Sequence, residues 1–153
     1  MERIIPIGDS DVLMRLLFSD EHYFDGEITD IAIPIVDLRE RGFSLDIQKI
    51  CDINAVKAKA ATLAERTLAK DKNARREPFV GKLINGEVMS LADSDGNFLF
   101  ETCHSPVEGN YAHASLFCKE KGKSRSHYLL ARNKLRPLLV QGISKLCDLS
   151  NSD

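Results

Sequence analysis

The sequence lacks most of the features that assign a chain to a familiar class of proteins. Its four cysteines, Cys51, Cys103, Cys118 and Cys147, lie far apart and include no CxxC pair. No apolar run approaches the roughly eighteen residues that a membrane-spanning helix needs, and the chain does not open like a signal peptide, with a basic and then an apolar segment. We therefore expect a cytoplasmic protein without membrane contact, whose free thiols are mostly buried structural residues.

A strong charge of one sign is also missing. The formal net charge is −2, with five basic and eleven acidic side chains in residues 1–50 and eight basic and five acidic ones in residues 101–153. Segments of opposite charge would attract each other within the fold or across a dimer. The basic excess is too small to identify a nucleic-acid binder, so nucleic acid is only a weakly supported partner.

What the sequence does contain is the composition of one globular domain. It has 153 residues, of which 43% are hydrophobic and 29% are charged. We place this domain at residues 1–149 and expect residues 150–153 to form a disordered tail. A chain of this length can bury enough apolar surface to fold without a disulfide or a metal.

The hydrophobic pattern predicts an α+β fold with a mixed or mostly antiparallel sheet of about six or seven strands and two main helices. Strands are expected at 3–7, 12–18 (where a short helix is the alternative), 28–36, 43–47, 98–102 and 111–118, with a hairpin over 79–91 that turns at Asn85-Gly86. Helices are expected at 52–75 and 126–147. Pro137 predicts either a kink in the second helix or two abutting helices. Asp25-Gly26 and residues 95–97 predict further turns.

Chemically active side chains concentrate in residues 101–118, ETCHSPVEGNYAHASLFC. Together with His127, the residues Cys103, His104, His113 and Cys118 offer the thiolate and imidazole groups that zinc prefers. The one tight pair among them is adjacent in sequence, and adjacent side chains on a strand point to opposite faces. We therefore predict no metal site and no cofactor.

His113 is the strongest single candidate for acid–base chemistry. Alanines flank it, and it would share a strand face with Ser115, as in an H-x-S arrangement for phosphate or acyl chemistry. Enzymes that cleave phosphoesters with paired motifs of this kind need a second copy, and His104-Ser105-Pro106 does not supply one. A histidine that is simply hydrogen-bonded within the fold is the alternative interpretation.

Several segments resemble a group of small uncharacterised bacterial proteins. The matching stretches are Met14-Arg15-Leu16 (an arginine-bearing strand), DGEITDIAI, GFSLDI (an L-S-V-like strand), FVGKLINGEVMSL and SPVEGNYAHASL, the last of which is similar to a DP…NPAHA signature. Ser105 stands where that signature has aspartate, and Tyr111 stands where it has proline. The occurrence of such proteins in mobile or defence-related bacterial loci implies a role beside an operon partner.

The same opening is distantly similar to toxins of the ADP-ribosyltransferase type. Those enzymes use an arginine or histidine on a first strand, a serine on a second strand and a late glutamate. Arg15, Ser44 and Glu101 stand at the corresponding places here. The resemblance implies that the arginine would pair with dinucleotide phosphates, the serine would support a ribose and the carboxylate would stabilise an oxocarbenium-like centre.

Two functions follow as hypotheses. The first is a cytoplasmic bacterial accessory protein, in a defence-related or toxin-related operon, that binds a protein partner or a second copy of itself. Its binding residues would be Asn110, Tyr111, His113, Lys121, Lys123 and Arg125. The second is an enzyme, NAD-consuming or directed at phosphoesters, that uses His113 with Arg15, Ser44 or Glu101. It requires these side chains to converge on one pocket.

Overall fold

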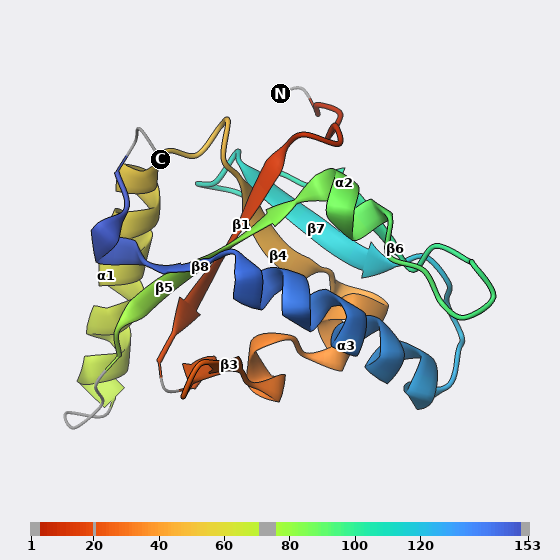
Figure 1. Cartoon of the computed structure of the whole chain (residues 1–153). Coiled ribbons are helices and arrows are strands. Elements are labelled where there is room, and N and C mark those ends of the chain that lie inside the picture. Colours follow the sequence, from red (N-terminus) through yellow and green to blue (C-terminus); the bar gives the residue numbers. More distant parts are fainter. Residues whose placement is uncertain (1–3, 20, 71–75, 151–153) are drawn as a thin grey trace.

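The structure is a computed structural model that describes residues 4–19, 21–70 and 76–150. Six strands form an antiparallel sheet in the order β6-β7-β4-β1-β5-β8, and β2 and β3 form a small second sheet (Figure 1). The predicted α+β class with a mostly antiparallel sheet is therefore confirmed. No helix within the described ranges is long and apolar enough to cross a membrane.

Strand β1 (Val12–Phe18) lies inside the sheet and pairs with β5 (Pro78–Ile84) along its whole length. Its buried residues alternate between the two faces, with Leu13 in one hydrophobic cluster and Met14 in the other. This period of two confirms the strand interpretation of residues 12–18 over the helical one. On its other side, β1 pairs with β4 (Phe43–Ile47) through two register positions only, so the two strands diverge after Met14.

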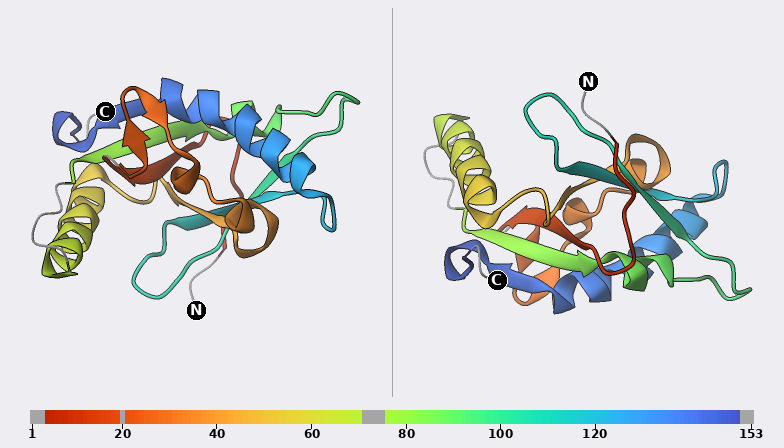
Figure 2. Two further views of the ribbon diagram at one scale, coloured as in Figure 1. Left: turned by 90° about the horizontal axis from the view of Figure 1, so that it is seen from below. Right: turned by 90° about the horizontal axis from the view of Figure 1, so that it is seen from above.

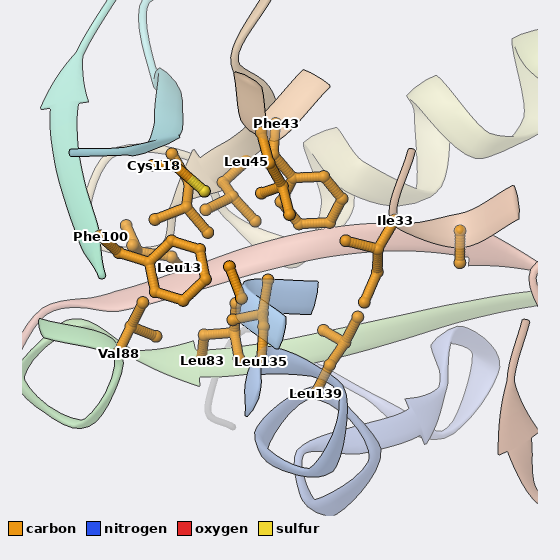
Figure 3. Close-up of a cluster of buried hydrophobic side chains, with 14 of the residues drawn as sticks. Leu13, Ile33, Phe43, Leu45, Leu83, Val88, Phe100, Cys118, Leu135 and Leu139 are labelled. Carbon is orange, nitrogen blue, oxygen red and sulfur yellow. The ribbon is translucent and has the colours of Figure 1, made fainter. Parts of the chain in front are cut away.

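The two long helices lie on opposite faces of the sheet (Figure 2). Helix α3 (Arg125–Gln141) packs on the larger core, and Figure 3 shows its Leu135 and Leu139 among side chains of several strands. Helix α1 (Ile53–Lys70) packs against β1 and β5 on the other face, through Val56 and Ala60. No helix of the described residues covers β6 (Phe100–His104) and β7 (His113–Cys118) on that face, so polar side chains there reach solvent.

The last helix ends earlier than predicted. It runs through Pro137 as one helix and stops at Gln141, so a helix to residue 147 and a pair of abutting helices are both wrong. The reason is tertiary: the Lys82 amide donates to the Gly142 carbonyl at 3.0 Å, which starts pairing with β5. Strand β8 (Ile143–Lys145) and a 3₁₀ turn (Leu146–Asp148) follow.

The prediction of a strand over 28–36 is wrong except at its start. Strand β3 (Glu27–Ile28) pairs with β2 (Tyr23–Phe24) across the predicted turn, where Asp25 and Gly26 have φ of 54° and 79°. A 3₁₀ turn (Asp30–Ala32) lies within the rest of this segment, and a π-helical turn (Asp37–Arg41) follows it. Ile33 and Ile35 are buried in the larger core without strand pairing, and Ile33 lies beside Leu139 of α3 (Figure 3).

The predicted hairpin over 79–91 is also wrong. After β5, residues Asn85–Met89 form the short helix α2, and the Asn85 side chain is buried instead of standing in a turn. Its amide donates to the Gly8 carbonyl at 3.2 Å, and its carbonyl accepts from the Thr102 hydroxyl at 2.7 Å. These long-range partners outweigh the local turn preference of Asn-Gly.

Smaller boundaries shift as well. The described part of the segment predicted as a first strand, residues 4–7, is not a strand, and its Ile5 amide instead donates to the ring of the buried His104. Strand β6 lies two residues later than expected, and β7 begins at His113 instead of residue 111. Residues 71–75 of the first predicted helix and 151–153 of the predicted tail lie outside the described residues.

Candidate functional site

The candidate site starts from the side of the sheet that α3 does not cover. Along β4 and β7, side chains alternate, so Leu45 and Leu116 enter the core while Ser44 and His113 point to the opposite face. Ser44 lies opposite Ser115 in register, and His113 lies opposite Asp46. The diagonal neighbours Ser44 and His113 are therefore brought together by pairing between two strands far apart in sequence.

His113 is held between a hydroxyl and a carbonyl. Its Nε2 is 3.1 Å from Ser44 Oγ, and its Nδ1 is 2.8 Å from the carbonyl oxygen of Ser105. A carbonyl can only accept, so the neutral ring carries its proton on Nδ1 and leaves Nε2 as an acceptor for the Ser44 hydroxyl. This is the arrangement in which a histidine activates a serine, with a backbone carbonyl in the orienting position.

Two further hydroxyls continue this chain of contacts. Ser105 Oγ lies 3.1 Å from His113 Nδ1 and 2.7 Å from Ser115 Oγ. Ser115 is almost completely buried, whereas Ser44 is exposed to solvent. The accessible end of the chain is therefore Ser44, and the Ser105–Ser115 pair braces the ring from behind.

Arg15 lies where β1 and β4 diverge. Its guanidinium donates to the Ser44 carbonyl at 2.9 Å and to the Ala32 carbonyl at 3.4 Å, and it stacks 4.3 Å from the centre of the Phe43 ring. Burial lowers the pKa of this guanidinium, against the opposing effect of the carboxylates of Asp37 and Asp46. Arg15 thus fills the gap that strand pairing leaves and fixes the backbone that carries Ser44.

Asp46 is the buried carboxylate of the site. One of its oxygens accepts from the Asn110 amide at 2.7 Å, and the other accepts from Lys59 Nζ at 3.1 Å. Asn110 also accepts from the Ala112 amide, which orders the loop just before His113. Asp46 therefore ties β4 to that loop and to helix α1.

A cleft of about 380 Å³ opens beside Ser44, between β1 and α1. Strands β1 and β4, helix α1 and two loop residues line it: Met14, Arg15, Leu16, Phe18, His22, Ser44, Asp46, Lys59, Leu63, Arg66, Thr67, Lys70 and Arg76. Five of these side chains are basic and one is a carboxylate. In a chain of net charge −2, this makes the cleft a local centre of positive potential, which favours anions.

The positive charges of the cleft are only partly neutralised. Lys59 pairs with Asp46, and Arg76 pairs with Glu21 at 2.8 Å while it donates to the Thr67 hydroxyl at 2.6 Å. Arg66 and Lys70 are exposed on α1 and form no ion pair with any described residue. Among the described residues, none occupies these two cations.

No family model matches the chain, and no curated protein or solved structure is significantly similar to it. The resemblances noted in the sequence thus remain resemblances. The site is argued from its own geometry. Within the described residues, no three histidine, cysteine, aspartate or glutamate side chains are grouped so that they could hold a metal ion.

The predicted catalytic residues come together in part. Ser44 contacts both of the others: its hydroxyl contacts the His113 ring, and its backbone carbonyl accepts from the Arg15 guanidinium, but His113 does not line the cleft. Glu101 lies on β6, in register with Phe117, and does not line the cleft. Its exposed carboxylate shares the sheet face that carries His113 but stands nearer the far end of β7.

The predicted binding residues form two separate groups. Asn110 and His113 belong to the site, and Tyr111 packs edge-on against His104 beside it, with 4.8 Å between ring centres.

The other group of predicted binding residues follows the opposite end of β7. Lys121 donates to the Arg39 carbonyl, Lys123 pairs with Glu120, and the exposed Arg125 begins α3.

Sequence reasoning missed the role of α1. Lys59, Leu63, Arg66 and Lys70 follow the spacing of one helical face, and this signal was present in the sequence. It did not indicate a site because a charged helical face is usually just solvated. This charged face of α1 lines a cleft because β1 lies beside it, and the sequence alone does not show that the two elements are neighbours.

Proposed function

We propose that the protein is an enzyme directed at phosphoesters, with Ser44 as nucleophile and His113 as its general base. The observation that carries this proposal is the chain from the Ser44 hydroxyl through His113 to the Ser105 carbonyl, with 3.1 Å and 2.8 Å between the atoms. The basic cleft beside Ser44 supports the choice of a phosphate-bearing substrate, because cations stabilise the charge of a phosphoryl group under attack.

The chemistry can be written with these groups alone. Ser44 Oγ passes its proton to His113 Nε2 and forms a bond to phosphorus, while the bond to the ester oxygen breaks. That oxygen leaves with the proton held by His113. Water, deprotonated by the same ring, then breaks the Ser44–phosphorus bond, and Ser44 recovers its proton. The Ser105 carbonyl accepts from Nδ1–H throughout and so stabilises the imidazolium that forms.

The proposal is tested by covalent capture and by turnover. A fluorophosphonate probe should modify Ser44, since a bond from Oγ to phosphorus forms as the phosphorus–fluorine bond breaks. The modified residue is identified by peptide mass spectrometry. Hydrolysis of bis(p-nitrophenyl) phosphate is followed in parallel by release of p-nitrophenolate. We expect His113→Gln to slow both reactions by about 100-fold or more, the usual contribution of a general base.

Matched variants separate chemistry from folding. Ser44→Ala should lose both reactions, whereas Ser105→Ala should keep most of each, because the carbonyl that orients His113 belongs to the backbone. Ser124 and Ser126, two exposed serines that hydrogen-bond each other at 2.8 Å, report non-specific modification in the same sample. Modification of Ser44 at no more than their rate would contradict the proposal.

The two other hypotheses stay predictions. Transfer of ADP-ribose would need a carboxylate at the reacting centre, and Glu101 lies outside the cleft. For an accessory role through a protein partner or a second copy, no feature of the described residues favours this hypothesis over the enzyme hypothesis. Size measurement of the purified protein against the 17.1 kDa of one chain tests self-association.

A further inference from the structure

We propose that the cleft takes a substrate with two phosphate-type groups, one at each end of an apolar portion. One group would lie at Ser44, and the other at Arg66 and Lys70. This inference rests on the proposed function for the identity of the reacting end. The second anionic group and the apolar portion follow from the cleft itself.

The first observation is that α1 and β1 run side by side along the cleft. At one end, Lys59 of α1 pairs with Asp46, which lies opposite Met14 of β1. At the other end, Arg76 joins the two elements, since it donates to Thr67 of α1 and stacks 4.2 Å from the centre of the Phe18 ring of β1. The two ends of the cleft are therefore fixed by separate contacts.

The second observation is the distance between these ends. Lys59 and Thr67 are eight residues apart on α1, which corresponds to about 12 Å along a helix. Met14 and Phe18 are four residues apart on β1, which corresponds to about 13 Å along a strand. A single phosphate cannot contact both ends, so a ligand that reaches the cations at the far end needs a second anionic group.

The third observation is the state of those cations. Lys59 is occupied by Asp46, and Arg76 is occupied by Glu21, but Arg66 and Lys70 form no ion pair with a described residue. Both lie on the helical face that Lys59 and Thr67 mark. Two unpaired cations on the cleft side of one helix turn are suited to a phosphate-type group.

The fourth observation is the lining between the two ends. Leu16 of β1 and Leu63 of α1 are half-buried and face the cleft there, with Phe18 beyond them. This apolar surface favours a ligand whose middle portion is apolar. The volume of about 380 Å³ falls in the range of small-molecule sites.

The test uses ligands that no hydrolysis can consume. Propane, hexane and decane bisphosphonates are titrated calorimetrically into the full chain, beside monophosphonates with alkyl chains of the same length. Their phosphorus–carbon bonds make binding independent of catalysis, so loss of the proposed enzyme activity and failure of this inference are distinguishable. We expect the decane bisphosphonate to bind about tenfold tighter than its monophosphonate and than the propane compound, the effect of one good charged contact.

Charge reversal identifies the second anchor. Arg66→Glu combined with Lys70→Glu should reduce the affinity for the decane bisphosphonate to that for the monophosphonate, and should leave the propane compound nearly unaffected. Lys134→Glu, the reversal of an exposed lysine on α3, is the control for reversed charge elsewhere on the surface and should change none of these affinities. Equal affinity for bis- and monophosphonates at every length, or equal binding by the doubly reversed variant, would overturn the inference.

Discussion

Among single residues, His113 shows how a backbone group can replace a side chain in orienting an imidazole. A carboxylate usually occupies that position in serine enzymes, and the nearest buried carboxylate here, Asp46, is engaged with Asn110 and Lys59 instead. The Ser105 carbonyl fixes the tautomer without adding a full negative charge. The site therefore depends on the path of the loop between β6 and β7 more than on the side chain at residue 105.

His22 makes the stability of the fold depend on pH. Its Nδ1 accepts from the Phe18 amide at 3.0 Å, and burial lowers its pKa below 6.5, with Glu21 opposing the shift and Arg15 and Arg76 adding to it. Between the lowered pKa and 6.5 the unfolded chain binds more protons, so stability is lost as the pH falls through this window.

The expected result is that His22→Gln removes this part of the acid sensitivity. The free energy of unfolding, measured by urea denaturation from about pH 7 to about pH 5, should decrease less in the variant than in the natural chain. An amide side chain can still accept from the Phe18 amide but does not titrate in this range. An identical decrease in both proteins would show that His22 is not the group responsible.

Among elements, the sequence predicted secondary structure correctly where one hydrophobic period extends over the whole element. β1, β4 and α1 could be predicted because alternation or helical spacing extends over their whole length. The turn predicted at Asn85-Gly86 does not form, because the side-chain amide of Asn85 is hydrogen-bonded to the Gly8 carbonyl and the Thr102 hydroxyl. These partners are distant in sequence, so no local pattern indicates them. The strand predicted at residues 28–36 does not form beyond Ile28, because Ile33 and Ile35 are buried in the core without strand pairing.

The end of α3 depends on the absence of a side chain at Gly142. A Cβ at this position would overlap the carbonyl oxygen of Lys82 on β5. Gly142→Ala should therefore displace β8 and lower the free energy of unfolding by about 1–3 kcal/mol, as overpacking does. Gly8→Ala is the matched control, because its Cβ would find its nearest atom, Asp11 Oδ2, at an ordinary 3.7 Å. Equal stability of the two variants in chemical denaturation would contradict this role.

For the whole molecule, the site was only partly visible in the sequence. Arg15, Ser44 and His113 could be singled out because residue type and order along the chain suggested them. The contribution of Lys59, Arg66 and Lys70 could not be predicted, because it exists only once α1 lies beside β1. Glu101 is the opposite case: its order along the chain suggested a catalytic role, but it lies on β6, outside the cleft.

One sheet joins the two hydrophobic clusters, and this predicts a single cooperative unfolding transition. Leu135→Ala in the larger cluster and Met14→Ala in the smaller one should each lower the free energy of unfolding by about 2–5 kcal/mol. Far-UV circular dichroism and tyrosine fluorescence, to which the buried Tyr128 contributes, should follow the same urea curve in both variants. Separate midpoints for the two signals in either variant would show that the clusters unfold independently.

The divergence of β1 from β4 has a mechanical consequence. The sheet consists of two three-stranded plates, β6-β7-β4 and β1-β5-β8, joined at two register positions and bridged by the guanidinium of Arg15. Within each plate the strands pair over more register positions than across this seam, so we expect the sheet to bend there. Ser44 and His113 belong to the same plate, so bending at the seam leaves their contact intact, whereas widening of the cleft would stretch the ion pair between Lys59 of α1 and Asp46 of β4.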